Sequence, residues 1–162
     1  MADSAKVRSR PVGAAAKLGR LGRPVISTVT GGALEIVTGV SEPGFNPIDL
    51  LYSSLAACLA LSARIAASQM GLLDRFEGVV VEVSGEKSAA EPYRIIRFDI
   101  KVEFAGDFDD ATRNALAHAA EDICTVSNTL KGDAEFVLSI ADRPSRLARL
   151  FPFFHQPVAL QL

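Results

Sequence analysis

Two neighbouring segments of the chain show the residue pattern of β-strands. From Ile96 to Phe104, apolar side chains occupy every second position and charged ones lie between them. A period of two gives a strand one buried face and one solvated face. The segment Gly78–Ser84 is rich in β-branched residues, and the polar stretch from Glu86 to Glu91 predicts a turn between the two strands.

Shorter strands are predicted near both ends of this region. Two β-branched runs, 25–30 and 33–38, are separated by Gly31-Gly32, which indicates a hairpin. A third apolar run, Ala134 to Ile140, follows the turn at Lys131-Gly132 and is predicted to form a closing strand.

The longest apolar run predicts a central helix from Asn46 to about Met70. Asn46 is a favoured cap, Pro47 suits the first helical position, and Gly71 suits the end. The run is apolar nearly all round and rich in small residues, so we expect neighbouring chain or a partner subunit to enclose it. A second helix is predicted from about Asp110 to Ile123, capped by Asp109.

These elements predict an α+β domain over residues 23–140, between a basic arm (1–22) and a C-terminal tail (141–162). A basic arm can bind phosphates, but this one lacks interleaved aromatic residues, so an edge strand or a partly disordered leader is favoured. The tail combines arginines with phenylalanines, which predicts a short amphipathic helix and an apolar extension. One small sheet cannot cover the central helix, which indicates a two-fold homodimer.

Composition limits the possible classes of protein further. The 162 residues are 49% hydrophobic, enough for one cored domain, and the net charge of −2 gives no case for binding nucleic acid. Polar residues interrupt the central helix, which favours a buried helix over a membrane span. The N-terminus lacks the apolar core of a signal peptide, so we expect a cytoplasmic protein. Its two cysteines, Cys58 and Cys124, are then free or catalytic.

The surroundings of the two cysteines resemble a known family. The first segment reads Gly44-Phe-Asn-Pro-Ile-Asp-Leu-Leu51 and then Leu55-Ala-Ala-Cys58; the second reads Cys124-Thr-Val-Ser-Asn-Thr-Leu130. Both resemble motifs of the OsmC/Ohr family of organic hydroperoxide reductases, roughly Pro-x-Glu-Leu-Leu before a cysteine, and Cys-Pro-Val-Ser-x-Thr-Leu. The resemblance covers about residues 23–140 and keeps the two motifs in order.

The resemblance implies a fold and an activity. The fold is an antiparallel sheet wrapped around a long central helix, in an intertwined homodimer. The activity is the reduction of organic hydroperoxides by a peroxidatic Cys58, with a resolving Cys124 that closes a disulfide, and small thiols or lipoyl groups as reductant. No metal or organic cofactor is implied.

A thiolate nucleophile needs a positive neighbour to lower its pKa, and an arginine is the natural choice. In the family this arginine comes from the N-terminal strand region. Arg23 is the best match here and Arg20 is the runner-up. For both residues the ordinary role of a solvated arm residue stays open.

Two departures from the family motifs concern the site itself. Ile48 stands where one branch of the family has a glutamate that holds the arginine, and the carboxylate falls one residue later at Asp49. Asp49 fits either that role or an ordinary first-turn acid at a helix N-terminus. Thr125 replaces the proline after the second cysteine, which we expect to loosen the turn that presents Cys124.

Other sites and functions are less well supported. His118 and His155 have no metal-ligand spacing with a cysteine, so both are expected to be ordinary surface residues. One alternative function is a lipid or small-molecule binding protein on the same fold, with weakened peroxidase chemistry. The other is a hotdog-type thioesterase, for which Asp49 is the available acid.

Overall fold

The computed structural model describes residues 11–39 and 41–140. Within them the chain forms two compact units. The first contains the strands that precede Asn46, and the second spans Pro47–Phe136. The tail predicted after residue 140, including His155, lies outside the described residues.

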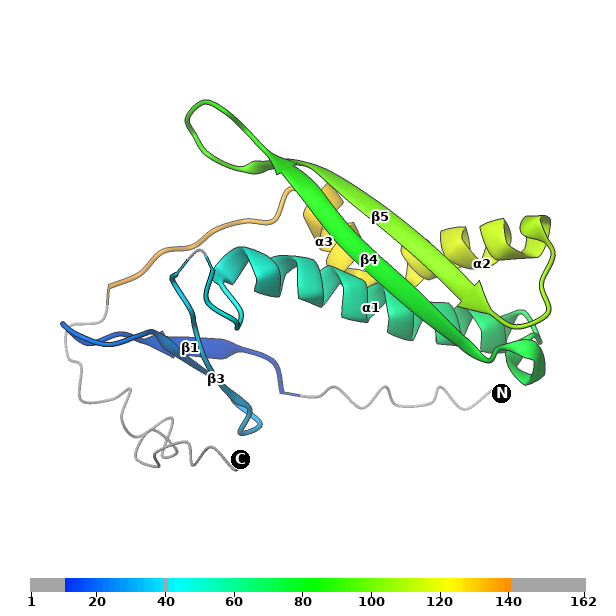
Figure 1. Cartoon of the computed structure of the whole chain (residues 1–162), viewed down its shortest axis with the longest axis horizontal. Coiled ribbons are helices and arrows are strands. Elements are labelled where there is room, and N and C mark those ends of the chain that lie inside the picture. Colours follow the sequence, from blue (N-terminus) through cyan, green and yellow to red (C-terminus); the bar gives the residue numbers. More distant parts are fainter. Residues whose placement is uncertain (1–10, 40, 141–162) are drawn as a thin grey trace, which may run out of the picture. The chain divides into compact units, whose positions relative to one another are not determined.

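The first unit is a three-stranded antiparallel sheet in the order β1-β2-β3 (Figure 1). Its strands are β1 (Ala14–Lys17), β2 (Val25–Thr28) and β3 (Ala33–Glu35). β2 and β3 confirm the predicted hairpin, although both are shorter than the runs that indicated them. β1 lies in the basic arm and forms an edge strand.

The turn between β2 and β3 requires a glycine. Gly31 has a φ of +95°, which a residue with a side chain rarely adopts. Its N–H donates to the Thr28 carbonyl, and the Thr28 N–H donates to the Gly32 carbonyl at 2.8 Å. These two bonds close the hairpin where Gly31-Gly32 predicted it.

The second unit is built on the long helix α1 (Pro47–Gln69). A short 3₁₀ turn, η1 (Leu73–Arg75), leads to the antiparallel strands β4 (Gly78–Lys87) and β5 (Ile95–Ala105). The helices α2 (Asp110–Ile123) and α3 (Thr125–Lys131) follow. The β4–β5 ribbon crosses α1, and α1 packs against β4, α2 and α3 (Figure 1).

The ends of α1 and α2 agree closely with the sequence prediction. α1 stops before Gly71, which has a φ of +69°. The Asp109 carboxylate caps α2 by accepting the Thr112 N–H at 2.8 Å. α3 was not predicted, because the sequence after Cys124 indicated only a polar turn.

The two faces of the β4–β5 ribbon have different chemistry. The inner face carries Val81, Val83 and Phe98 toward the core. On the outer face Lys101 bridges Glu82 at 3.7 Å and Glu103 at 2.5 Å. This division is the one that the alternation along 96–104 predicted.

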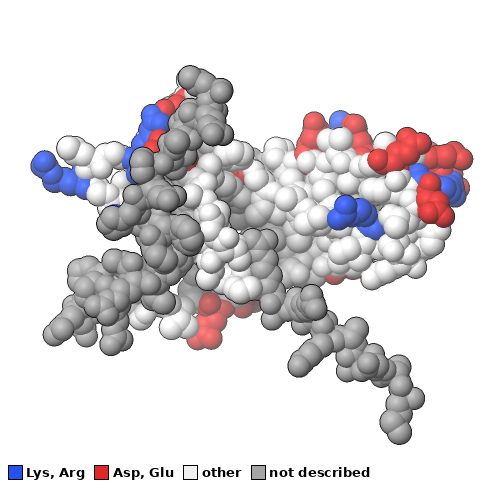
Figure 2. All heavy atoms as spheres, turned by 90° about the horizontal axis from the view of Figure 1, so that it is seen from below, with Lys and Arg blue, Asp and Glu red and all other residues white. Residues whose placement is uncertain are grey.

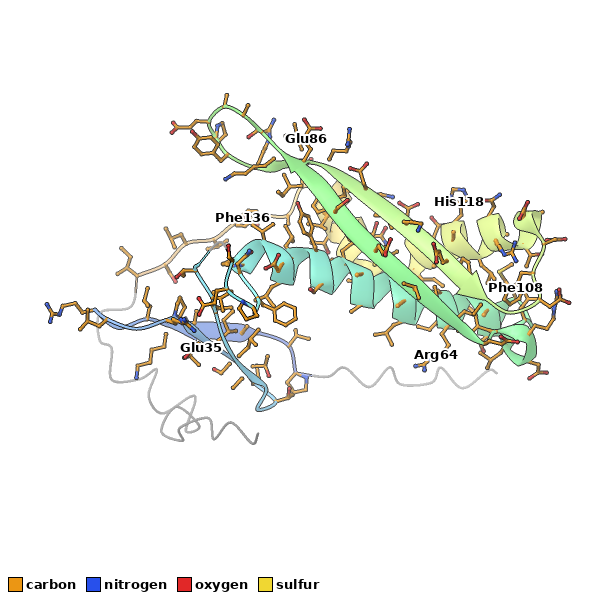
Figure 3. All side chains as sticks on the ribbon, viewed as in Figure 1. Glu35, Arg64, Glu86, Phe108, His118 and Phe136 are labelled. Carbon is orange, nitrogen blue, oxygen red and sulfur yellow. The ribbon has the colours of Figure 1, made fainter. Side chains whose placement is uncertain are left out.

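The predicted closing strand is wrong for the described chain. Residues 133–140 form no helix or strand. Phe136 is 97% exposed and Leu138 is 94% exposed, and no described strand pairs with them. Phe136 projects away from the ribbon in Figure 3. A β-strand is defined by its pairing with a neighbouring strand, and this segment has none among the described residues.

α1 also has an apolar face that the described chain leaves open. Leu61 is 57% exposed, and Ile65 and Met70 are exposed near it. Figure 2 shows this side of the second unit as a largely uncharged surface.

By length and composition α1 could cross a membrane, with a mean hydropathy of 1.6. A single such helix is weak support for a span, because the core helix of a soluble protein passes the same test.

Candidate functional site: a pair of thiols between α1 and α3

Cys58 lies in the middle of α1, on the side that faces the rest of the second unit. It packs with Leu55 and Leu59 of the same helix and with Val126 of α3. The thiol is half-buried. A rigid helix therefore fixes its position, and neighbours shield it without sealing it off from solvent.

Cys124 lies at the junction of α2 and α3 and is fully buried, with an exposure of 0%. Its backbone N–H donates to the carbonyl groups of Ala120 and Glu121, which ends α2. Its sulfur accepts the Ser127 N–H at 3.3 Å, so the thiol itself caps α3. The junction is therefore held by the residue that was predicted to be the resolving cysteine.

The structure brings the two thiols into direct contact. Both are free, and the Cys124 thiol is hydrogen-bonded to Cys58. They share a core cluster with apolar neighbours from α1, β4, β5 and α3. A disulfide between them would require their Cα atoms to lie within about 7 Å.

The hydrogen bonds around Cys58 lower its pKa. Burial on its own raises the pKa of this thiol, because a charged sulfur loses hydration. Donors from Cys124, the Val126 N–H, the Ser62 hydroxyl and the Thr125 N–H outweigh that effect. The balance favours the thiolate, which is the nucleophilic form of cysteine.

Cys124 is shifted in the opposite direction. Burial and the hydrogen bond with Cys58 raise its pKa, and the N–H groups of Ser127 and Val126 offset this only in part. When two thiols interact, ionisation of one holds the proton on the other. Within the pair, the sulfur on α1 therefore has the lower pKa and gives up its proton before the sulfur at the start of α3.

Arg23, the predicted activator, lies in the first unit just before β2. Its guanidinium pairs with Glu35 at 3.1 Å and also contacts Glu42. Val25 is opposite Glu35 in the β2–β3 register. Arg23, two residues before Val25, is therefore the diagonal neighbour of Glu35 on the same face. The predicted hairpin could therefore have indicated the pairing of Arg23 with Glu35, but no sequence signal pointed to Glu42. Arg20, the runner-up, is exposed.

Asp49 lies in the first turn of α1, in the second unit. The structure thus brings together Cys58 and Cys124, whereas Arg23 and Asp49 belong to different units. The sequence reasoning missed Ser62, which is 3% exposed and lies one helical turn beyond Cys58. Ser62 follows Cys58 by four residues on the predicted helix, and this spacing alone could have placed the two side chains on the same face.

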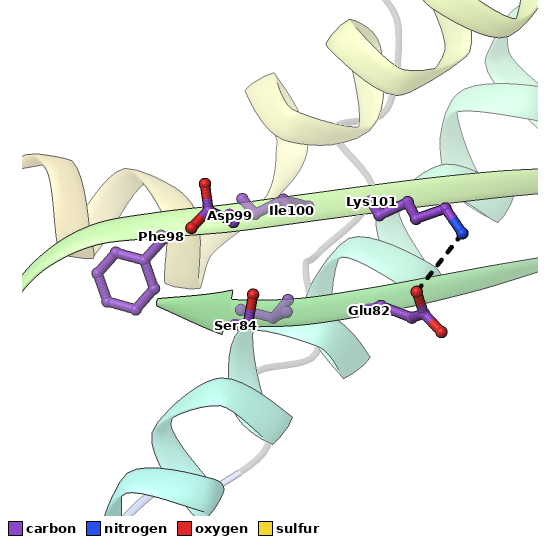
Figure 4. Close-up of a pocket in the computed structure, with 7 residues that line it drawn as sticks. Glu82, Ser84, Phe98, Asp99, Ile100 and Lys101 are labelled. Carbon is purple, nitrogen blue, oxygen red and sulfur yellow. Dashed lines mark ion pairs between the residues drawn. The ribbon is translucent and has the colours of Figure 1, made fainter. Parts of the chain in front are cut away.

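The remaining candidates lie away from the thiols. A surface hollow of about 490 Å³ lies on β4 and β5 (Figure 4), and neither cysteine is among its lining residues, Glu82, Val83, Ser84, Phe98, Asp99, Ile100 and Lys101. His118 projects from α2 at the surface (Figure 3). Across residues 11–39 and 41–140, no cluster of side chains could hold a metal ion.

A sequence model of the OsmC-like protein family matches residues 39–139, which include both cysteines. The chain belongs to the OsmC-like family. The family and the α+β fold that the two cysteine motifs predicted are confirmed. A comparison of this OsmC-like chain with curated proteins found no match.

Solved structures share the fold. An organic hydroperoxide resistance protein OsmC from Legionella pneumophila is 20% identical, with a TM-score of 0.65. The match covers 78% of this chain and 93% of the Legionella chain. The organic hydroperoxide resistance protein OhrB of Bacillus subtilis is 21% identical, with a TM-score of 0.60 and coverages of 75% and 91%. An OsmC-like protein from Mycoplasma pneumoniae is 17% identical, with a TM-score of 0.66 and coverages of 76% and 89%. At these identities the likeness is one of fold.

Proposed function

We propose that this OsmC-like protein is a thiol-dependent peroxidase that reduces organic hydroperoxides. The observation that carries the proposal is the direct contact between Cys58 and Cys124, with the pKa of Cys58 lowered and that of Cys124 raised. Family membership and the names of the Legionella and Bacillus neighbours support the choice of organic hydroperoxides as substrate.

The reaction divides into two steps. The Cys58 thiolate attacks one oxygen of the hydroperoxide; an S–O bond forms, the O–O bond breaks, and the departing alkoxide takes up a proton to become an alcohol. Cys124 then attacks the sulfur of the Cys58 sulfenic acid. The S–S bond forms, and the hydroxyl group leaves as water with the Cys124 proton.

Reduction of the disulfide completes the cycle. A dithiol such as a lipoyl group, or two small thiols, supplies two electrons and two protons and restores both cysteines. Cys124 has an exposure of 0%, whereas Cys58 is partly exposed, so Cys58 is the more accessible sulfur for the incoming thiolate.

Arg23 is proposed to supply a positive charge to Cys58 and to orient the peroxide. Within its own unit it is paired with Glu35 and Glu42, which would hold the guanidinium in one direction. Asp49 is proposed as a further acid that orients it. A planar guanidinium stays charged at all relevant pH values and can donate two parallel hydrogen bonds.

The active form is proposed to be an intertwined homodimer in the cytoplasm. The exposed apolar face of α1, with Leu61 and Ile65, and the unpaired segment 134–140 leave apolar surface that a second copy would cover. Exposed apolar surface of this kind usually marks an interface, and two-fold symmetry is its commonest solution.

Peroxide consumption by the purified protein tests the proposal. With cumene hydroperoxide and dihydrolipoamide we expect turnover that Cys58→Ser lowers by about a thousandfold or more, because a serine hydroxyl is far less nucleophilic than a thiolate. Ser53→Ala, an exposed change on the same helix, is the control and should keep full activity. Unchanged activity in Cys58→Ser would refute the proposal. A copurifying lipid with negligible peroxidase activity would instead favour a binding protein.

A further inference from the structure

The two carboxylates that meet Arg23 hold its guanidinium in different ways. Oε1 of Glu35, a residue of β3, accepts a hydrogen bond from Nη1 of Arg23 at 3.1 Å. Glu42 lies in the segment that follows β3, and its carboxylate accepts from the other terminal nitrogen, Nη2. The Glu35 side chain is 56% exposed, whereas that of Glu42 is 28% exposed. Water screens an exposed ion pair, so the contact with Glu42 is the stronger constraint.

The backbone at Arg23 is tied to the end of β3. Pro24 follows Arg23, and a residue that precedes a proline is restricted to extended conformations. The Pro24 carbonyl accepts the Ile36 N–H at 2.8 Å, and Ile36 is buried. The guanidinium lies at the far end of a long side chain with many rotamers, so it still needs a partner that fixes its direction.

The segment that carries Glu42 folds back on itself. The Val37 N–H donates to the Phe45 carbonyl at 3.1 Å, which joins the two ends of the segment. The Glu42 N–H donates to the Gly39 carbonyl at 3.3 Å and closes a turn between them. This return of the chain brings Glu42 beside Arg23, which no local sequence pattern could show.

Close packing at Gly44 fixes the return segment further. Gly44 has a φ of +148°, and a Cβ added there would lie 2.4 Å from Cγ1 of Val37. Val37 is itself buried, so it has little room to move aside. A residue with a side chain could not pass so close. The backbone of the segment therefore sets the position of Glu42 independently of its contact with Arg23.

We propose that Glu42 is the positioning residue for Arg23, and that the contribution of Glu35 to this role is minor. The inference deepens the proposed function and rests on it for the action of Arg23 on Cys58. A guanidinium has more N–H donors than two carboxylates occupy, so a guanidinium fixed in direction can still donate to a further acceptor. Glu42 belongs to the same unit as Arg23, whereas Asp49 belongs to the second unit.

The first test compares Glu42→Gln with Glu35→Gln in the full-length protein. Iodoacetamide alkylation of Cys58, followed by mass spectrometry as a function of pH, measures the thiolate. If a well-placed cation stabilises the thiolate, Glu42→Gln should move the midpoint to higher pH and slow alkylation about tenfold at pH 7, which corresponds to one pKa unit. Glu35→Gln should slow it about twofold. Ser41→Ala, an exposed change in the same segment, should match the wild type.

A second arm shows whether Glu42 acts through Arg23. In an Arg23→Ala background, Glu42→Gln should leave the alkylation midpoint where Arg23→Ala alone puts it, because residues that act as a unit are not additive. A shift that persists in this background would overturn the proposal. Equal shifts in Glu42→Gln and Glu35→Gln would overturn it as well. Faster alkylation in Glu42→Gln would also do so, since Glu42 would then only neutralise Arg23.

Nitrogen-detected nuclear magnetic resonance of the Arg23 side chain tests the positioning without Cys58 or hydroperoxide. Its signal is assigned by its loss in Arg23→Ala. Glu42→Gln should speed rotation of the guanidinium about tenfold, since a hydrogen bond to a charged group is lost. Unchanged rotation would overturn the inference and leave the peroxidase proposal intact. Faster rotation with normal alkylation in both Glu42→Gln and Arg23→Ala would instead refute the action of Arg23 on Cys58.

Discussion

The middle and the C-terminal end of α1 are packed in different ways. Toward its C-terminal end, Ala66 and Ala67 meet Leu116 of α2 and Phe108 in a cluster that contains only apolar side chains. Near its middle, Leu55 and Leu59 meet the thiols of Cys58 and Cys124, and hydrogen bonding from Ser62 and the start of α3 lowers the pKa of one of these thiols.

The difference lies in the hydration that is lost when polar groups are buried in the thiol cluster. Buried polar groups lose hydration, and only hydrogen bonds offset the loss. The first cluster avoids that cost, whereas the second gathers several donors around one sulfur. Arrangements that shift pKa values in this way are typical of functional sites. The apolar cluster should then govern stability, and the thiol cluster should govern chemistry.

The largest effect on stability is expected in the apolar cluster. Leu116→Ala removes a side chain with 0% exposure and should lower the free energy of unfolding by about 2–5 kcal/mol. Urea unfolding measures the change, and Cys58 alkylation at a temperature where the variant is folded should match the wild type. If the alkylation rate changed as much as the stability, the two clusters would not be separate in function.

An intermediate effect is expected at the cap of α3. Cys124→Ala removes the sulfur that accepts the Ser127 N–H and should cost about 1 kcal/mol of stability. Cys124→Ser is the matched control, because serine is a favoured cap and should retain most of that stability. Neither variant should form the disulfide after peroxide treatment. Equal unfolding curves for the alanine and serine variants would argue against the capping role of the thiol.

The smallest effect is expected from Ser62→Ala. Loss of the hydroxyl should raise the pKa of Cys58, so alkylation should slow about two- to tenfold at pH 7 and stay unchanged above the midpoint. Ser54→Ala is the control, since that exposed hydroxyl donates to the Leu51 carbonyl at 2.8 Å and not to a thiol. A uniform change at every pH would indicate a packing effect in place of a hydrogen bond.

Much of the second unit follows from local sequence signals. Pro47 and Gly71 mark the ends of α1, Asp109 marks the start of α2, and alternation along β5 assigns its two faces. Each of these signals acts within a few residues, so no knowledge of the remaining fold is needed to interpret it.

What the sequence did not predict depends on contacts between distant segments. The Thr125–Lys131 helix lacks a conventional cap, because its cap is a cysteine, and its β-branched first residues are poor helix formers. The run 134–140 has the pattern of a strand but no described partner. Apart from Ser62, the groups that lower the pKa of Cys58 come from the junction of α2 and α3, where Cys124 lies 66 and Val126 lies 68 positions further along the chain.

The central claim is that Cys58 and Cys124 form one redox pair, and a disulfide map tests it most directly. The reduced protein is treated with one equivalent of cumene hydroperoxide, free thiols are blocked, and peptides are identified by mass spectrometry. The account predicts a Cys58–Cys124 disulfide within one chain, with both thiols lost and one equivalent of alcohol formed. Two free thiols after the peroxide has been consumed, or disulfides only between chains, would contradict it.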